Sequence, residues 1–167
     1  MNEINRTEIA TIGEFGLIDH LTADIAPINK ETVMGVGDDA AILKFDESEE
    51  VLVTTDLLME GVHFDLTYVP LKHLGYKAAM VNFSDVYAMN GYPKQLVVSI
   101  ALSKRFCVED MEDFYEGLRI ACAAHGVDIV GGDTTSSMTG LTISNTCIGE
   151  ADKDTIVYRK GAKDTDL

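Results

Sequence analysis

Apolar residues recur along this chain with two different periods, which predict helices interleaved with short strands. Residues 13–25, 71–85 and 108–125 each place apolar side chains at steps of three and four, the spacing of one helix face. Pro27 and Gly126 follow the first and the third of these segments and are typical helix terminators. In the first segment the apolar stripe consists of Phe15, Leu17, Ile18, Leu21 and Ile25.

Shorter apolar and β-branched runs between these segments predict strands. Residues 40–45 and 50–56 flank an acidic turn, so we expect them to pair as a hairpin. Residues 95–102 predict a further strand, residues 128–133 a strand that runs into a loop, and residues 140–151 a longer strand. The helical and strand segments alternate irregularly. We therefore expect an α+β fold in which a mixed sheet carries helices on one face.

Composition limits the function classes open to the chain. Its 167 residues are 46% apolar, enough for one compact domain, and the formal net charge of −15 argues against nucleic acid and anionic membranes as partners. The acidic runs 46–50 and 109–113 are typical of a solvated surface. Three widely spaced cysteines and an N-terminus without an apolar signal core favour a cytoplasmic protein with reduced thiols.

Four aspartates, each closing an apolar run, are the strongest chemical signal. Asp39, Asp56, Asp85 and Asp133 occupy such positions. Carboxylates gathered at the ends of buried elements suit hard divalent cations, and Mg²⁺ combines one or two of them with substrate phosphates. Asp85 also continues an apolar helix stripe, where a metal ion would offset its desolvation; alternatively, it lies near the helix end and reaches water. Phosphoryl transfer is the leading hypothesis.

Smaller motifs add to this hypothesis and leave alternatives open. Gly131 and Gly132, before Asp133, either let backbone approach a ligand or serve a tight turn. His63 either hydrogen-bonds a phosphate or substrate, or is packed or solvated. The glycine-rich phosphate loop and the protein-kinase signatures are absent from the sequence, so any kinase activity uses another fold.

Five motifs occur in order in a region from about Gly13 to Ala162: GEFGLI, GVGDDAAIL, TTDLLMEGVHF, KAAMVNFSDVYAMNGYP and IVGGDTT. Together they resemble the N-terminal half of the thiamine-monophosphate kinase family, within the superfamily of aminoimidazole ribonucleotide synthetase. The resemblance implies ATP-dependent phosphorylation of thiamine phosphate to thiamine diphosphate. It also implies a homodimer in which the sheets of two copies pair. Residues 1–150 would form the ATP- and Mg²⁺-binding domain, and residues 151–167 would begin the connection to a C-terminal domain.

The resemblance also implies a set of site residues. The Mg²⁺ ligands would be Asp39, Thr54, Thr55, Asp56, Asp85 and Asp133, with Asp38 close by. His63 would contact the substrate, and the ATP contacts would be Tyr115, Gly132, Asp133 and Arg159. No side chain would act as a covalent or acid–base catalyst, because the acceptor is already an ionised phosphate and the metal ions assist direct in-line transfer.

Two other functions fit the same carboxylates. A metal-dependent phosphohydrolase would use them to activate water, and would release free phosphate without thiamine phosphate. A non-catalytic metal-binding or dimerisation module would bind cations but no nucleotide.

Overall fold

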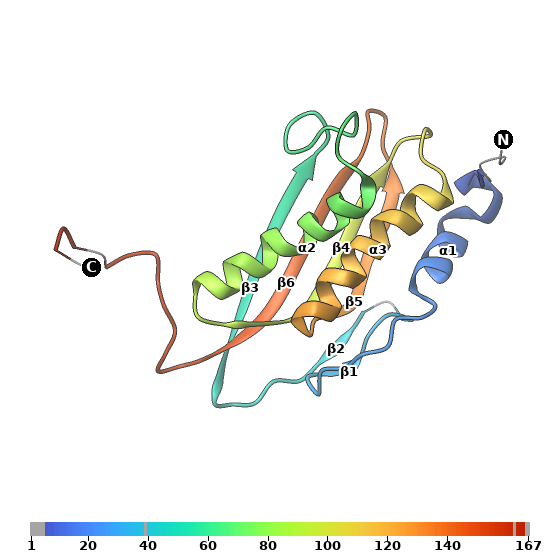
Figure 1. Ribbon diagram of the computed structural model, residues 1–167. Coiled ribbons are helices and arrows are strands. Elements are labelled where there is room, and N and C mark those ends of the chain that lie inside the picture. The colour runs from blue at the N-terminus through green and yellow to red at the C-terminus, as the bar shows by residue number, and fades with distance from the viewer. Residues whose placement is uncertain (1–5, 39, 162, 166–167) are drawn as a thin grey trace.

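A mixed sheet forms one layer of the structure, and helices cover one of its faces (Figure 1). The computed structural model describes residues 6–38, 40–161 and 163–165. The strands of the main sheet are β3 (Glu49–Met59), β4 (Tyr92–Leu102), β5 (Asp128–Ser136) and β6 (Thr142–Asp152). The helices are α1 (Ile9–Thr22), α2 (Leu71–Ala88) and α3 (Val108–His125). This arrangement confirms the predicted α+β fold with helices on one face.

The sheet has the strand order β3-β6-β4-β5, so β3 and β5 are its two edges within the described residues. β6 pairs antiparallel with both β3 and β4. β4 and β5 run parallel, and α3 connects them across the face of the sheet. A parallel pair needs such a crossover, because a tight turn cannot return the chain to the same end.

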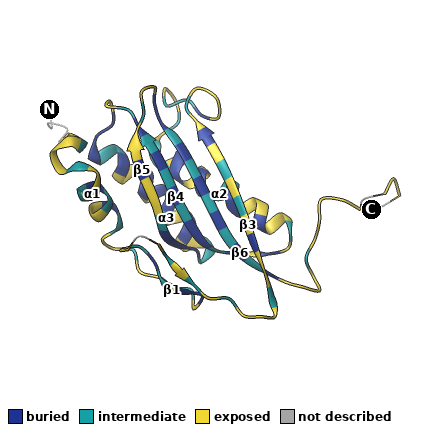
Figure 2. Cartoon of the chain, turned by 180° about the vertical axis from the view of Figure 1, so that it is seen from behind, coloured by how far each residue is buried: buried dark blue, intermediate teal, exposed yellow. Residues whose placement is uncertain are grey.

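Side chains alternate between the two faces of the sheet, as the pleat requires. In β3, Leu52 and Leu58 point to the helices and are buried, whereas Val53 and Leu57 point to the other side and are exposed. Phe83 of α2 and other large apolar residues are fully buried on the helix side. Figure 2 shows the opposite face, which neither α2 nor α3 covers. We call this uncovered surface the open face.

The two long helices pack closely because glycines meet at their contact. A Cβ at Gly75 would lie 1.9 Å from the Phe114 carbonyl oxygen, and one at Gly117 would lie 1.9 Å from that of Lys72. Any larger residue would force the helices apart. Gly126 ends α3 in the left-handed conformation, with φ 66°, which confirms the predicted terminator.

Three predictions about local structure are wrong. Residues 40–45 do not pair with β3: Ile42–Leu43 (β2) pairs with Thr32–Met34 (β1), and β3 pairs with β6 instead. The helix predicted over residues 13–25 ends earlier, at Thr22, and a non-helical kink at Gly13 (φ 71°) separates it from an additional turn that begins at Ile9. Phe15 is 80% exposed, so only the Leu17 and Leu21 part of the predicted stripe is buried. Helical spacing identified this helix but did not fix its bounds.

In the described part of the chain, every helix falls short of the length and apolar character that crossing a bilayer requires.

Candidate metal and phosphate site

Among the described candidate aspartates, Asp56 and Asp133 do not close their elements, contrary to the prediction, whereas Asp85 lies near its helix end, as one of the two alternatives proposed. Asp56 lies inside β3, Asp85 lies in the last turns of α2, and Asp133 lies inside β5. Asp39 falls outside the described residues, and the neighbouring Asp38 is exposed in the segment after β1. Each of these elements therefore continues past its aspartate, β3 to Met59, α2 to Ala88 and β5 to Ser136.

Asp56 and Asp85 lie close together where edge strand β3 meets α2. Thr54, two residues before Asp56 on the same face of β3, donates a hydrogen bond of 2.6 Å from Oγ1 to Asp85 Oδ2. Asp56 Oδ2 is buried and has no hydrogen-bond partner in the described structure. Burial raises the pKa of Asp56 and the charge of Asp85 raises it further, while His63 lowers it. An unpartnered buried oxygen beside a second carboxylate is a favourable place for a cation.

Asp85 itself is exposed. It flanks the buried stripe of α2, and the side chains that fill this stripe include Ala78, Asn82 and Val86. Of the two alternatives that the sequence left for Asp85, the structure therefore agrees with the one in which this carboxylate reaches water. Its hydrogen bond to Thr54 still fixes one oxygen, and the other remains accessible on the same side of the fold.

Thr55 and Asp133 lie on the open face, away from Asp56 and Asp85. Asp133 is opposite Ser99 in β4, and Ser99 is opposite Ser144 in β6. Thr55 donates to the Asn145 carbonyl at 2.9 Å and accepts a hydrogen bond from Thr146 Oγ1 at 3.1 Å. Two strands separate β3 from β5, which corresponds to about 14 Å. One protomer in this arrangement does not bring Asp133 and Asp56 to a single ion.

Gly132 has a packing role that the sequence left open. A Cβ at this position would lie 1.8 Å from the Val98 carbonyl oxygen, so the contact between β4 and β5 requires glycine. At Gly131, in contrast, a Cβ would meet no other atom within 4 Å. The glycine pair lies inside β5 and forms no loop, which corrects the prediction that residues 128–133 are a strand that runs into a loop.

His63 lies in the turn that follows β3, with its ring fixed by the backbone. Its Nδ1 accepts a hydrogen bond of 3.0 Å from the Met59 N–H. An N–H group can only donate, so Nδ1 carries no proton and the neutral ring has its proton on Nε2. The His63 carbonyl in turn accepts a hydrogen bond of 2.8 Å from Lys77 Nζ on α2. His63 is exposed, so Nε2–H is available to a ligand.

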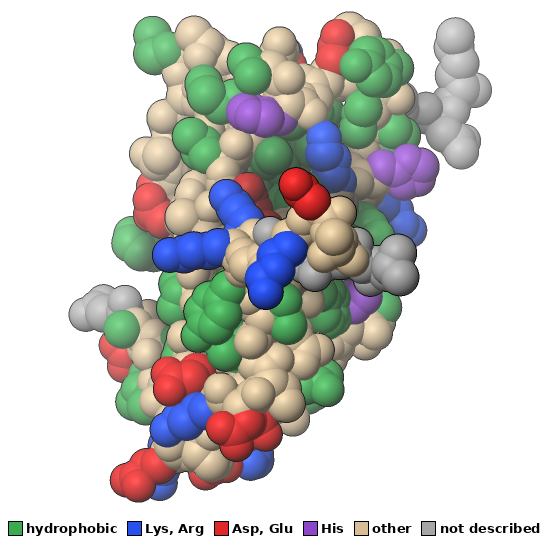
Figure 3. All heavy atoms as spheres, turned by 90° about the vertical axis from the view of Figure 1, so that its left-hand side faces the viewer, with side chains coloured by type: hydrophobic (Ala, Val, Ile, Leu, Met, Phe, Trp, Pro, Cys, Tyr) green, Lys and Arg blue, Asp and Glu red, His purple; other side chains and the backbone are tan. Residues whose placement is uncertain are grey.

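The remaining predicted ATP contacts lie elsewhere. Tyr115 is 6% exposed within α3, and burial raises the pKa of its hydroxyl to about 12. Arg159 is exposed in the C-terminal segment, which extends away from the two layers in Figure 1. Figure 3 shows Lys and Arg side chains gathered on the molecular face from which this segment leaves. Tyr115 is thus a core residue of α3, whereas Arg159 is free to approach a ligand.

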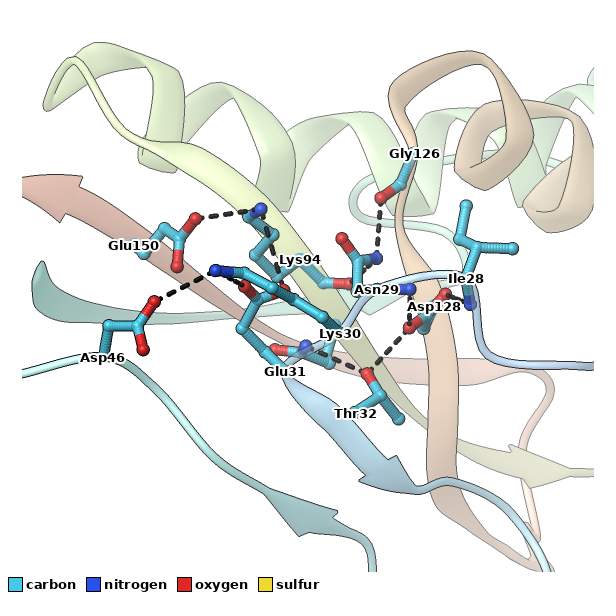
Figure 4. A network of polar contacts seen from close by, with 11 residues as sticks. Ile28, Asn29, Lys30, Glu31, Thr32, Asp46, Lys94, Gly126, Asp128 and Glu150 are labelled. Carbon is cyan, nitrogen blue, oxygen red and sulfur yellow. Dashed lines mark hydrogen bonds and ion pairs between the residues drawn. The ribbon is translucent and has the colours of Figure 1, made fainter.

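A buried polar network anchors the segment that leads into the GVGDD motif (Figure 4). Asp128, at the start of β5, is 3% exposed and accepts hydrogen bonds from the Ile28 and Asn29 N–H groups at 2.7 and 3.0 Å. It also accepts one from Thr32 Oγ1 at 2.7 Å, and Gln95 donates to that same hydroxyl at 3.0 Å. This network fixes the start of the candidate metal-binding segment against the sheet.

Two residues of this region, Lys77 and Asp128, were not among the candidates that the sequence indicated. Lys77 lies eight residues before Asp85 and therefore on the same flank of α2, a spacing that could have identified it. Asp128 begins an apolar strand, and only the tertiary structure shows which backbone groups it accepts from. Within the described residues, no three His, Cys, Asp or Glu side chains are arranged to hold one metal ion. The described candidate ligands therefore form one carboxylate pair, Asp56 and Asp85, while Thr55 and Asp133 lie on the opposite face of the sheet.

An acidic α+β domain with a carboxylate pair between a sheet edge and a helix belongs to the class of proteins suited to divalent cations and phosphates. Comparison with known families identifies it further. The chain belongs to the AIR synthase related protein family, whose N-terminal domain matches residues 37–151. This match includes β3, α2, β4, α3, β5 and nearly all of β6.

Individual relatives agree with this assignment. The thiamine-monophosphate kinase of Bacillus subtilis is 36% identical over 155 residues, which cover 92% of this chain and 47% of the relative. The crystal structure of the thiamine-monophosphate kinase from Stenotrophomonas maltophilia K279a is similar with a TM-score of 0.74 and 30% identity, over 88% of this chain and 45% of that one. The structure described as AaThiL complexed with AMPPCP and TMP has a TM-score of 0.65 and 38% identity, over 92% and 46%. The chain spans about half the length of the curated relatives it matches.

Proposed function

We propose that this chain is the nucleotide- and metal-binding domain of an ATP-dependent thiamine-phosphate kinase, which forms thiamine diphosphate. The observation that carries the proposal is the Asp56 and Asp85 pair, with a buried oxygen that lacks a partner, in a chain whose relatives are thiamine-monophosphate kinases. A relative of 38% identity is described as complexed with AMPPCP, an ATP analogue, and TMP. Both substrates of the proposed reaction are therefore compatible with this fold.

The residues present fit a magnesium ion at the β3–α2 edge. Asp56 and Asp85 would hold it, with Thr54 orienting Asp85 through its hydrogen bond. Mg²⁺ needs only one or two carboxylates beside phosphates and water, so this pair suffices. Bound there, the ion would screen the repulsion between two anionic substrates and stabilise charge on the transferred phosphoryl group. Thr55 and Asp133 would serve a separate position on the open face, and Asp39 remains a proposed ligand.

The protein side chains would mainly bind and orient the substrates. The Nε2–H of His63 would donate a hydrogen bond to the substrate, because its Nδ1 is already occupied by the Met59 N–H. Arg159 would pair with ATP phosphates, and Gly132 and Asp133 would contact the nucleotide from β5. The acceptor phosphate is ionised near neutral pH and needs no general base, so we assign no acid–base role to any residue.

We also propose that the open face binds a second copy of the chain along β3, the sheet edge opposite to the proposed nucleotide contacts on β5. On β3 alone, Val51, Val53, Leu57 and Met59 are between 43 and 67% exposed on this face. A row of exposed apolar residues on an uncovered sheet is typical of an interface. Sedimentation should therefore show a dimer for the natural chain and a monomer for Val53→Lys. Ile120→Lys, which places the same charge on α3, should remain dimeric.

The proposed domain division follows the end of the matched region. Residues 1–150 would be the kinase domain, and residues 151–167, which start at the last residue of the family match, would begin a connection to a C-terminal domain. A cytoplasmic location is supported by the cysteines, since Cys107, Cys122 and Cys147 are all buried and unpaired.

The activity is tested by ³¹P NMR of the chain with ATP, Mg²⁺ and thiamine phosphate, alone and with the separately produced C-terminal half of the Bacillus subtilis relative. We expect thiamine diphosphate signals in at least one of the two samples. If free phosphate accumulates in a sample from which thiamine phosphate is left out, this result would favour the phosphohydrolase alternative. Magnesium binding without any nucleotide binding would favour the non-catalytic module.

A further inference from the structure

The flank of α2 that faces edge strand β3 carries a second chemical group besides Asp85. Lys77, Val81 and Asp85 follow one another at steps of four and share this flank. Asp85 contacts Thr54 of β3, and Lys77 contacts the turn that follows β3. The helix flank thus spans from a carboxylate at one end to an ammonium group about 12 Å away along the axis.

Among the residues that the structure describes, no acid neutralises the charge of Lys77. Within the described chain, its hydrogen bond goes to the His63 carbonyl oxygen at 2.8 Å, and no carboxylate lies within ion-pair distance. Lys72, one and a half turns earlier on α2, differs in this respect, because it pairs with Glu116 at 2.6 Å. A carbonyl accepts one N–H of the ammonium group and leaves its full charge and two further donors available.

The turn that Lys77 contacts is well fixed. The Gly61 N–H donates to the Phe64 carbonyl at 2.8 Å, and the Phe64 side chain is 6% exposed and belongs to the hydrophobic core. The His63 N–H donates to the Met59 carbonyl at 2.9 Å, and the Met59 N–H donates to the His63 ring. The His63 ring is therefore held with Nε2–H outward before any ligand arrives.

The acid of the same turn is already paired. Glu60 forms an ion pair with Arg105 and accepts a hydrogen bond of 2.9 Å from the Leu141 N–H. These contacts lower the pKa of Glu60, the largest cause being the hydrogen bond from Arg105. Its charge is thus balanced locally and opposes an anion beside His63 only weakly.

We propose that Lys77 and His63 together form a binding site for a phosphate monoester, with Lys77 as a second contact that also fixes the His63 turn. The site rests on the proposed function, in which this monoester is the phosphate of thiamine phosphate. Two donors of different kinds belong to this one turn: the Lys77 ammonium group bonds the His63 carbonyl, and the His63 ring is exposed with its proton on Nε2. The acceptor phosphate is thereby placed on the same α2 flank as the cation held by Asp56 and Asp85.

The test is an NMR titration of ¹⁵N-labelled chain with three probes: inorganic phosphate, thiamine phosphate and unphosphorylated thiamine. We expect both phosphate probes to shift the His63 ring nitrogens and thiamine alone to leave them unchanged. Lys77→Met should weaken the binding of thiamine phosphate by about tenfold or more, the usual effect of losing a charge-assisted hydrogen bond. Lys77→Arg, which keeps the charge, should retain most of the affinity.

Lys72→Met is the matched control, because it removes the same charge from the same helix. It should leave thiamine phosphate affinity within about twofold of that of the natural chain, since distant sites act independently. Equal affinity for Lys77→Met and the natural chain would overturn the proposed role of Lys77 and leave the kinase proposal intact. Failure of both phosphate probes to bind the natural chain would overturn the site itself. If inorganic phosphate binds in a Lys77-dependent way and thiamine phosphate does not, the anion site stands and the proposed substrate is wrong.

Discussion

Replacing Asp56 with Asn should stabilise the metal-free protein and remove its response to Mg²⁺. Asp56 Oδ2 is buried without a hydrogen-bond partner, and its charge is close to that of Asp85. Asn has nearly the same shape and no charge, so the repulsion disappears. A carboxylate retained for a cation should thus reduce stability when the cation is absent.

The magnitude follows from the buried oxygen. An unpartnered buried polar group costs about 1–3 kcal/mol, and the amide of Asn remains polar, so we expect a gain of about 1 kcal/mol at pH 7. For a chain of this length, that gain corresponds to about 2–4 °C in Tm. The pKa of Asp56 is raised in the folded state, so its cost is present above that pKa and disappears as the pH falls toward the ordinary value of 3.8. The advantage of Asp56→Asn should vanish over the same interval.

Thermal denaturation measures both effects. In buffer with a chelator at pH 7, Asp56→Asn should melt above the natural chain. With Mg²⁺ at about 100 times its dissociation constant, the natural chain should gain about 2.7 kcal/mol and the variant should gain nothing. The control is Asp46→Asn, because Lys30 lowers the pKa of Asp46 and removal of that attraction should not stabilise the protein. A metal-free Asp56→Asn that melts below the natural chain would refute this reasoning.

Three further predictions concern the scaffold. Gly75→Ala should lower stability by about 1–3 kcal/mol in urea denaturation, because its Cβ would strike the Phe114 carbonyl; an unchanged midpoint would contradict the close helix contact. Asp128→Ala should cost at least about 3 kcal/mol, since three hydrogen bonds to a buried carboxylate are lost, and hydrogen exchange should show the 28–32 segment exposed. The Glu109 carboxyl accepts hydrogen bonds from the Thr7 N–H and hydroxyl, so ¹³C NMR should show it titrating with a pKa of about 2. Its contribution to stability should then be lost as the pH falls from 4.5 toward 2. A pKa near 4.5 would show that this contact is absent in solution.

Elements with strong local signals were predictable from the sequence. α3 combines a long helical period with Gly126, and both appear in the structure as predicted. The pairing of β2 was not predictable, because Ile42–Leu43 is too short for its pattern to select a partner. Its acidic turn favoured a hairpin with β3, but β3 instead pairs along its whole length with β6, which is distant in sequence. Long-range pairing outweighed the local turn signal.

The candidate site was predictable as a set of residues but not as an arrangement. Asp56 and Asp133 each follow apolar residues, yet they point to opposite faces of the sheet. The face depends on the register of each strand, and an irregularity between Leu96 and Val97 shifts the pairing of β4 with β5. A shift of one residue reverses the face of every following side chain. Sequence alone therefore could not place Asp133 relative to Asp56.

The central claim, that Asp56 and Asp85 hold the metal ion of a bound nucleotide, is tested most directly by calorimetric titration of the chain with AMPPCP. Titrations would be run with Mg²⁺, with a chelator, and with Asp56→Asn in Mg²⁺. We expect binding in the first experiment and an affinity lower by about tenfold or more in the other two, since each lacks one partner of a charge-assisted contact. Equal affinity in all three would contradict the claim and separate nucleotide binding from this carboxylate pair.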